Sequence, residues 1–404
     1  MHQNPIAPKV AAMGQTAQPR AFFSVFVIWL GGLGAAAQWA KVSVIFDQLS
    51  GVYPGAGLML GWALTLIGVT GILLGVVAGL LATRLGLRRV FLGGMVLGAL
   101  VSAAQAMGLS FNLFLASRVV EGFAHLAIVV AAPTLIAQAT PARYRPFALT
   151  LWGTFFGVAF AVVAWVGQPL AVVQGPEALY AAHAVWMAVM AGLAWGVLPA
   201  SAPTSGPGLS ARSILRQHVA IYRSPFVSAP AVAWLFYTFC FVSMITLLPP
   251  FLPEGSRALV VGMIPLATLV TSMTIGNFLL RSISAISVIQ LSFFGTMLSL
   301  LGLLIWPGAP VVAIIWAGCL GLAQGAGFAA VPELNADVAS QSQANGAMAQ
   351  TGNLGNTIGT PLLLLALSGA GYAGMMVASI LVLAIGLFLQ WLLVRARRAQ
   401  MVHS

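Results

Sequence analysis

The sequence predicts an all-α integral membrane protein with twelve transmembrane helices in two pseudo-symmetric halves of six. Sixty per cent of the 404 residues are hydrophobic and 6% are charged, whereas about a quarter of the residues of a soluble domain are charged. Apolar runs of about 20 residues, the length that crosses a bilayer core, occur twelve times. Residues 79–84, Gly-Leu-Leu-Ala-Thr-Arg, have an echo at 276–281, Gly-Asn-Phe-Leu-Leu-Arg. An echo 197 residues further along the chain indicates that a multi-helix unit was duplicated.

The twelve predicted spans follow one another with short connections, and many Gly and Ala residues allow close helix packing in lipid. Their expected ranges are 22–46, 56–82, 90–108, 112–138, 147–170, 181–200, 226–250, 258–280, 285–306, 310–332, 347–367 and 372–394.

The distribution of Lys and Arg predicts the orientation. With a cytoplasmic N-terminus, 14 of the 17 basic residues fall in cytoplasmic segments, while Arg257 falls in an outer loop and Lys41 and Arg118 within spans. Basic residues gather on the cytoplasmic side of membrane proteins. Both termini are therefore expected to be cytoplasmic.

The predicted organisation has five parts: a cytoplasmic tail at 1–20, six-helix halves at 21–200 and 226–394, a linker at 201–225 and a tail at 395–404. The first apolar segment is interpreted as a retained span rather than a cleaved signal peptide. Within the linker, Ser210 to Arg223 is typical of an amphipathic helix on the inner membrane surface. The alternative is a disordered basic linker.

Composition and motifs argue against several other classes. The net charge of +11 has no basic cluster with interleaved aromatics, so no nucleic-acid partner is expected. Cys240 and Cys319 lie in apolar runs without a CxxC pattern, and no cofactor or metal site is expected. No catalytic constellation or P-loop occurs, which argues against an enzyme or an ATP-driven pump. Abundant Ala and Gly favour a bacterial inner (plasma) membrane protein.

A loop after the second span carries a family signature. Residues 79–89 read Gly-Leu-Leu-Ala-Thr-Arg-Leu-Gly-Leu-Arg-Arg. With the twelve spans and the two related halves, this resembles the Gly-x-x-x-Asp-Arg-x-Gly-Arg-Arg signature of the major facilitator superfamily (MFS), bacterial 12-span type. The resemblance implies a secondary transporter, commonly monomeric, with a cytoplasmic gate at this loop; its residues here are Gly79, Thr83, Arg84, Gly86, Arg88 and Arg89. Thr83 replaces the usual Asp and Leu87 the frequent Arg, so we expect a weaker latch.

Two carboxylates in the second half are candidates to replace the missing acid. Glu333 and Asp337 are predicted one helical turn apart at the inner end of the tenth span, where they would pair with Arg281. The alternative is that both are solvated groups at a helix end.

The fourth span contains three ionisable residues, Arg118, Glu121 and His125, on one helical face. Ionisable groups deep in a span are functional candidates. The span also resembles the Arg-x-x-Gln-Gly pattern of the family, with Glu121 in the Gln position. Glu121 and His125 are candidates for proton coupling and Arg118 for holding a solute. The alternative is a hydrogen-bonded cluster that fixes this span against its neighbours.

Other substrate-binding candidates are polar or aromatic. In the first span, Gln38 and Lys41 lie in the outer half; Lys41 either extends to the membrane interface or faces the cavity, where a second cation beside Arg118 would favour an anionic solute. The remaining candidates are uncharged: Trp152, Trp234, Tyr237, Gln324, Asn353 and Asn356.

The function predicted from these features is alternating-access transport of a small organic solute, weakly favoured as anionic, coupled to protons and requiring only lipid and solute as partners. An exporter of an amphipathic compound, such as a drug or siderophore, is the main alternative. The fifth span lacks the Gly-Pro step of proton-driven exporters in this superfamily, which weakens that alternative. A membrane-embedded enzyme or a sensor is less well supported.

Overall fold

The computed structural model describes residues 7–199 and 210–402, and these residues form helices joined by short turns without any strand. The first half comprises α1 (Ala7–Ser43), α2 (Phe46–Val52), α3 (Trp62–Leu85), α4 (Leu87–Gln105), α5 (Phe111–Ala139), α6 (Arg145–Gly153), α7 (Phe155–Val162), α8 (Gln168–Gln174) and α9 (Pro176–Val197). After α10 (Ala211–Arg223), the second half comprises α11 (Ser228–Leu247), α12 (Glu254–Thr271), α13 (Asn277–Leu279), α14 (Ala285–Ile305), α15 (Pro310–Leu334) and α16 (Val338–Val402). Two π-helical turns, Val163–Gly167 and Ser272–Gly276, join α7 to α8 and α12 to α13.

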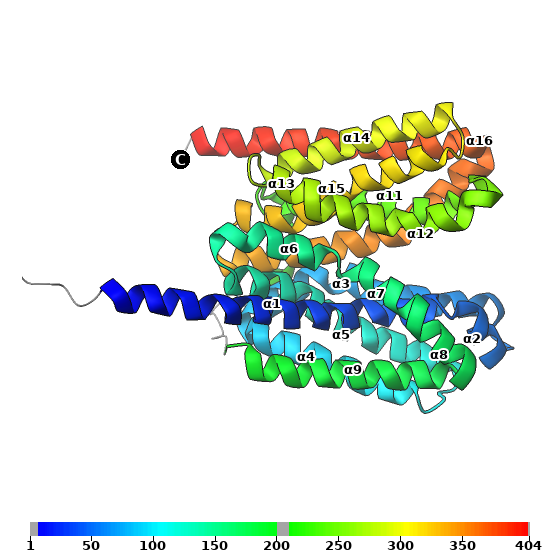
Figure 1. Ribbon diagram of the computed structural model, residues 1–404, viewed down its shortest axis with the longest axis horizontal. Coiled ribbons are helices and arrows are strands. Elements are labelled where there is room, and N and C mark those ends of the chain that lie inside the picture. Colours follow the sequence, from blue (N-terminus) through cyan, green and yellow to red (C-terminus); the bar gives the residue numbers. More distant parts are fainter. Residues whose placement is uncertain (1–6, 200–209, 403–404) are drawn as a thin grey trace, which may run out of the picture.

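Eleven helices among the described residues are long and apolar enough to cross a membrane. Ten agree with predicted spans to within a few residues. The last, Val338–Met401, is 64 residues long, roughly 96 Å if straight, against a bilayer core of about 30 Å. Its helix is interrupted by non-helical backbone at Ala370 and Gly371, where φ is 64° at the glycine, and the chain reverses direction in α16 (Figure 1). Division at this break would yield the twelve predicted spans.

The two halves lie side by side with their helices roughly parallel to the long axis of the molecule (Figure 1). The start of α1 and the end of α16 lie at the same end, which we call the terminal end. The other end is the opposite end. Both termini lying at one end agrees with an even number of crossings.

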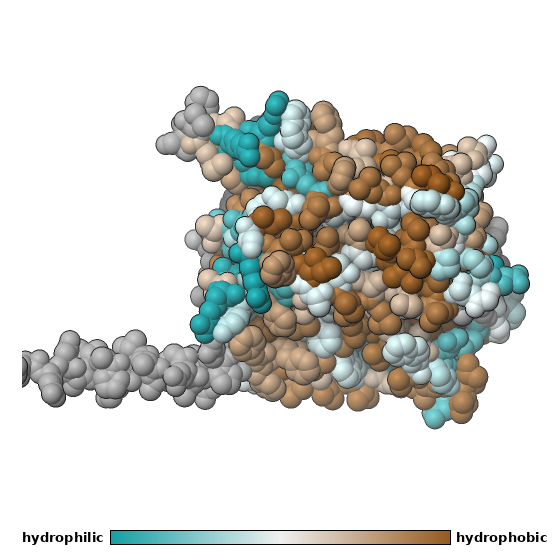
Figure 2. All heavy atoms as spheres, turned by 45° about the horizontal axis from the view of Figure 1, so that its top comes forward, coloured by the Kyte–Doolittle hydropathy of each residue, from teal (hydrophilic) through white to brown (hydrophobic). Residues whose placement is uncertain are grey.

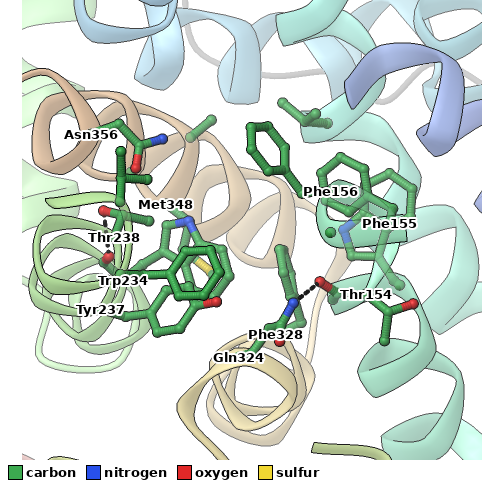
Figure 3. A pocket seen from close by; sticks show the side chains of 18 of the residues that line it. Thr154, Phe155, Phe156, Trp234, Tyr237, Thr238, Gln324, Phe328, Met348 and Asn356 are labelled. Atoms are coloured by element: carbon green, nitrogen blue, oxygen red, sulfur yellow. Dashed lines mark hydrogen bonds between the residues drawn. The ribbon is translucent and has the colours of Figure 1, made fainter. Parts of the chain in front are cut away.

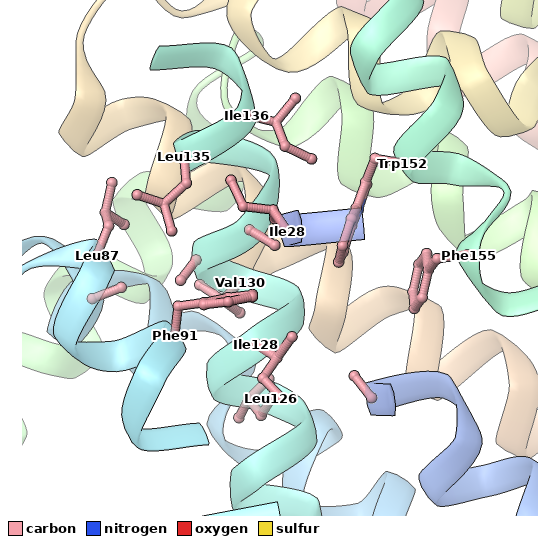
Figure 4. Packing of buried hydrophobic residues seen from close by; sticks show 14 of the residues in the cluster. Ile28, Leu87, Phe91, Leu126, Ile128, Val130, Leu135, Ile136, Trp152 and Phe155 are labelled. Carbon is pink, nitrogen blue, oxygen red and sulfur yellow. The ribbon is translucent and has the colours of Figure 1, made fainter. Parts of the chain in front are cut away.

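The core of the first half is built from apolar side chains of neighbouring helices. Phe91 of α4, Ile128 of α5 and Trp152 of α6 are each fully buried and converge with Ile28 of α1 (Figure 4). Van der Waals contacts between these buried side chains stabilise the packing of the helices. This packing holds α5, which carries the ionisable residues, rigidly inside the half.

The outer surface is suited to lipid. Large apolar side chains are exposed there, such as Leu100 (64%), Trp165 (73%) and Leu365 (68%). Figure 2 shows hydrophobic side chains across the middle of the molecule and hydrophilic ones toward its two ends. An apolar belt between polar ends is the surface expected of a membrane protein.

Two predicted segments outside the spans differ in outcome. Residues 1–6 and 200–209 lie outside the described residues, but α1 already begins at Ala7, so the segment predicted as a tail is helical from there. Four alanines favour a helix here, whereas Gly14 and Pro19 disfavour one. The linker contains a helix at Ala211–Arg223, and Ser210 caps it by accepting a hydrogen bond from the Ser213 amide at 3.2 Å.

Candidate functional site: a central cavity and a buried ion cluster

A cavity lies between the two halves, and we call it the central cavity. Helices α1, α5, α6 and α7 line it from the first half, and α11, α12, α15 and α16 from the second. Its volume is about 110 Å³, several times the roughly 10–15 Å³ that one water requires. The cavity can therefore hold a small solute.

The walls of the central cavity are aromatic and polar but uncharged. Aromatic residues approach from both sides, and Gln324 and Phe328 of α15 lie between them (Figure 3). Seven predicted site residues line the cavity: His125, Trp152, Trp234, Tyr237, Gln324, Asn353 and Asn356. Among the described residues, the lining includes no Asp, Glu, Lys or Arg. Aromatic walls with a few amides are typical of a small-molecule site.

Several polar atoms of this lining lack a hydrogen-bond partner within the described part of the chain. They are Gln324 Oε1, Asn345 Oδ1, Asn356 Oδ1 and Trp152 Nε1, and all four are buried. A buried polar group without a partner costs roughly 1–3 kcal/mol. Polar groups of a solute or of water would remove this cost, so the four atoms are candidate hydrogen-bonding points.

Hydrogen bonds between the two halves occur beside the cavity and between it and the terminal end. Gln324 Nε2 donates to the Gly153 carbonyl at 2.5 Å, and Asn345 Nδ2 donates to Thr134 Oγ1 at 2.9 Å. Nearer the terminal end, Ser342 Oγ donates to the Gly79 carbonyl at 2.9 Å. This structure is therefore closed on the terminal side of the cavity.

The ionisable residues of α1 and α5 form a separate group inside the first half. Lys41, Arg118 and Glu121 are each fully buried, and we call them the buried ion cluster. The Glu121 carboxylate pairs with Lys41 Nζ at 2.6 Å and with Arg118 Nη1. Arg118 also donates to the Ala63 and Gln38 carbonyls, both at 2.8 Å. The formal charges of the three side chains sum to +1.

Two helices that contributed no predicted substrate-binding or proton-coupling residue complete this cluster. Lys41 Nζ donates to Ser102 Oγ at 2.6 Å and to Gln105 Oε1 at 2.7 Å, both on α4. Ser102 Oγ lies 2.7 Å from Nδ1 of His183 on α9, and His183 Nε2 lies 2.9 Å from the Gly34 carbonyl. A carbonyl only accepts, so Nε2 carries a proton, and in the neutral ring Nδ1 accepts from the Ser102 hydroxyl.

His183 stands alone among apolar residues in the sequence, but packing of α9 against α4 brings it to Lys41. In the sequence, the only indication of this group is that its polar residues lie within apolar spans. No sequence spacing links residues on three different helices.

Four predicted binding or coupling residues lie outside the cavity lining: Gln38, Lys41, Arg118 and Glu121. The extension of Lys41 to the membrane interface is wrong, because its side chain is fully buried against Glu121. His125 connects the two parts of the site. It lines the cavity, lies 3.0 Å from the Ala35 carbonyl through Nδ1, and is one helical turn, about 6 Å along the axis, from Glu121.

The loop after α3, where the gate is predicted, makes a tight turn. Gly86 adopts φ = 88° between α3 and α4, a conformation that glycine adopts without steric cost. Arg88 donates to the Trp195 carbonyl at 2.6 Å and stacks on the Trp195 ring at 4.7 Å, within the first half. Thr83 donates to the Leu80 carbonyl at 3.3 Å. Arg84 is half-buried and Arg89 exposed.

The predicted pairing of Glu333 and Asp337 with Arg281 is wrong for this structure. Helix α15 ends at Leu334, so the two carboxylates do not share a helix. Glu333 accepts from the Ala285 amide at 2.9 Å, at the start of α14, and Asp337 accepts from the Ser340 amide at 2.9 Å, at the start of α16. Carboxylates are stabilised at helix N-termini by unpaired amides and the helix dipole, which explains these positions.

Comparisons with known proteins agree with this geometry. The family model described as the Major Facilitator Superfamily matches residues 25–360. Among solved structures, the chain is similar to the MFS transporter FucP in an outward conformation (14% identity, 94% of this chain and 99% of that chain, TM-score 0.73). It is also similar to the human organic anion transporter MFSD10 (16%, 92% and 99%, 0.73) and to the proton:xylose symporter XylE (14%, 93% and 96%, 0.72). No curated protein matches the chain.

Proposed function

Because the chain belongs to the Major Facilitator Superfamily and has the fold of its membrane transporters, we propose that it is a secondary active transporter that moves a small organic solute by alternating access, coupled to protons. The observation that carries this proposal is the central cavity, which both halves line and which contacts between the halves close on the terminal side. The structure then corresponds to the state that faces the opposite side. With both termini cytoplasmic, that side is the outside of a bacterial inner membrane.

The solute binds between aromatic walls and hydrogen-bonds to the amides of the cavity. Gln324, Asn345 and Asn356 each have a buried polar atom that needs a partner, and these three residues come from α15 and α16. Trp152 on α6 supplies a donor from the first half. A solute that contacts both halves can stabilise one arrangement of them over another, which is the requirement for transport.

Proton coupling follows from the charge balance of the buried ion cluster. Two cations and one carboxylate lie in an interior where the described residues place no other formal charge nearby, and an unbalanced charge there is unfavourable. An anionic solute in the neighbouring cavity would restore the balance, and uptake of a proton by Glu121 or His125 would add positive charge that such an anion offsets. Solute and proton then alter each other's binding, which is what coupling means thermodynamically. Glu121 and His125 are the proposed proton-exchanging groups, since His125 reaches the cavity wall.

Export of an amphipathic compound is the second candidate. The observation that favours it is the uncharged, largely aromatic lining of the cavity, which suits an apolar body with few polar groups. The direction of solute movement relative to the proton gradient distinguishes the two functions.

The experiment that tests the proposed function is solute-driven proton movement in proteoliposomes. Organic acids and amphipathic amines are screened against wild type, His125→Asn and Glu121→Gln, with Gly93→Ala as the control because a methyl group at Gly93 meets nothing within 4 Å. We expect one class of solute to move protons in wild type and control but at least tenfold less in the two site variants. Equal proton movement in all four proteins would remove Glu121 and His125 from the mechanism.

A further inference from the structure

Helix α10 has an exposed stripe in which arginines alternate with apolar side chains. Arg212, Leu215, Arg216, Val219 and Arg223 recur every three or four residues along one side of the helix, and all five are exposed. They line one shallow hollow on the surface. Residues 210–223 contain no Asp or Glu, so the stripe is uniformly positive. We call it the arginine stripe.

The chemistry of the arginine stripe fits the headgroups of anionic lipids. An amphipathic helix at a bilayer surface places apolar side chains at the boundary with the acyl chains while its arginines bind phosphates. Leu215 is 66% exposed and Val219 is 40% exposed. Exposure of these apolar side chains favours contact with lipid over contact with water alone. Arginine suits phosphate because its planar guanidinium donates two parallel hydrogen bonds.

The other side of α10 is attached to the closed interface between the halves. Ile221 is 2% exposed and belongs to an apolar cluster that includes Leu80 of α3 and Ala347 of α16. The Tyr222 hydroxyl donates to Gln350 Oε1 on α16 at 2.7 Å, and Gln350 Nε2 donates to the Ile72 carbonyl on α3 at 2.6 Å. These contacts link the linker helix to both halves.

The protonation of Tyr222 and one further contact strengthen this link. Burial raises the pKa of Tyr222 to about 12, so its hydroxyl keeps the proton that it donates to Gln350. The chain just after α10 is held to the second half, because Arg397 Nη1 donates to the Pro225 carbonyl at 2.7 Å. Displacement of α10 would therefore be transmitted to the contact between α16 and α3.

We propose that α10 is a lipid-controlled clamp: anionic headgroups of the surrounding membrane bind the arginine stripe and so favour the state in which the terminal end is closed. A ligand shifts an equilibrium only if it binds one state better than the other. Here the lipid favours the closed state, in which Ile221 and Tyr222 of α10 make their contacts at the interface between the halves. The inference rests on the alternating-access states of the proposed function, but its test requires no solute.

The test measures the separation of the two halves at the terminal end in lipid nanodiscs. Spin labels are placed at Leu85 and Ser282, which are exposed at that end of the first and second halves, in a protein with Cys240 and Cys319 replaced by alanine. Nanodiscs contain phosphatidylcholine alone or with half phosphatidylglycerol. We expect the anionic lipid to raise the ratio of closed to open protein about tenfold, since each arginine near an anionic surface contributes about fivefold.

Matched variants separate lipid binding from its transmission. Arg212→Gln/Arg216→Gln is expected to abolish the lipid effect, whereas Arg395→Gln/Arg398→Gln, which removes the same charge from the exposed end of α16, should retain it. Tyr222→Phe removes only the hydroxyl and should reduce the effect at least threefold.

Several outcomes would overturn the inference. They are an undiminished lipid effect in Arg212→Gln/Arg216→Gln, an equal loss in the α16 control, or the same shift caused by inorganic phosphate in phosphatidylcholine nanodiscs. A distance that responds to pH or solute but not to lipid would reject the clamp alone. A distance that never changes would instead reject alternating access.

Discussion

At the scale of the residue, Glu121 limits the cost in stability of burying the two cations of the ion cluster. It is the single carboxylate between Lys41 and Arg118, and all three side chains are fully buried. Loss of Glu121 leaves two cations without a counter-charge, whereas loss of Lys41 leaves the Arg118–Glu121 pair intact. Breaking a buried ion pair typically costs 3–5 kcal/mol.

These two positions therefore provide a paired stability prediction. We expect Glu121→Gln to destabilise the protein by about 3 kcal/mol or more. Lys41→Met should cost less, about 2 kcal/mol, because Gln105 Oε1 and Glu121 Oε1 lose their donor while Arg118 still balances the carboxylate. Thermal unfolding in detergent at pH 7 measures both. Equal losses, or a larger loss for Lys41→Met, would contradict the assigned charge balance.

Asp337 provides a pH prediction at a site outside the membrane. Hydrogen bonds from the Ser340 hydroxyl and amide lower the pKa of this carboxyl below its usual value. A lowered folded-state pKa means that the ionised form stabilises the fold above the unfolded-state pKa, near 4. This stabilisation is lost as the pH falls through the folded-state value.

Asp337→Asn retains a capping side chain but does not titrate. We expect wild type to exceed this variant in stability at pH 7, by less than about 1 kcal/mol because the site is exposed, and the difference to vanish near pH 3. Unfolding temperatures of both proteins at the two pH values provide the measurement. A difference that grows toward pH 3 has the wrong sign and would reject the assigned role.

At the scale of the element, α3 and α16 form the closest contact between the halves. A methyl group at Gly346 of α16 would lie 2.5 Å from the Gly75 carbonyl oxygen and 2.9 Å from Gly79 Cα. Such distances are too short for a real contact, so the backbones approach closely only because these positions lack side chains. The contact between α3 and α16 at these glycines involves no charged group. Thr83, also on α3, stands where the family signature has an acid.

Gly346→Ala is therefore predicted to open the terminal end. We expect the distribution of Leu85–Ser282 label distances to shift to longer values, with the closed population falling at least tenfold. Gly93→Ala should leave the distribution unchanged, since no atom lies within 4 Å of the added methyl group. An unaltered distribution in Gly346→Ala would show that the α3–α16 contact does not hold the end closed.

The helices themselves were largely predictable from the sequence, and the grouping of site residues was only partly so. Apolar runs of membrane length predicted the spans because lipid requires every backbone group to be paired within a helix. They did not reveal that Trp39 faces the cavity while Lys41, two residues later, points into the first half. That difference depends on the rotation of α1 against its neighbours, which packing decides.

The same limit explains the errors. Asp337 and Glu333 were placed on one helix because their spacing allows it, but the chain leaves the helix after Leu334. His183 is not among the predicted site residues, because its partner Ser102 comes from another helix. Contacts between distant helices are a property of the tertiary structure and have no local pattern.

At the scale of the whole molecule, the two halves share one cavity and differ in their chemistry. The first half contains the buried ion cluster, and the second contributes the amides of Gln324, Asn353 and Asn356. In the proposed mechanism a solute between them contacts both halves, and His125 relays its presence toward the buried ion cluster. The halves can then exchange contacts at the terminal end for contacts at the opposite end, which is the motion of alternating access.

The measurement that tests this account most directly follows both ends of the molecule in the same sample. One label pair, at Leu85 and Ser282, reports the terminal end, and another, at Met107 and Trp306, reports the opposite end, where these side chains are exposed. Distances are recorded in nanodiscs over a range of pH, with and without a solute that moves protons. The account predicts that when one distance lengthens the other shortens. Two distances that stay fixed, or that change in the same direction, would contradict it.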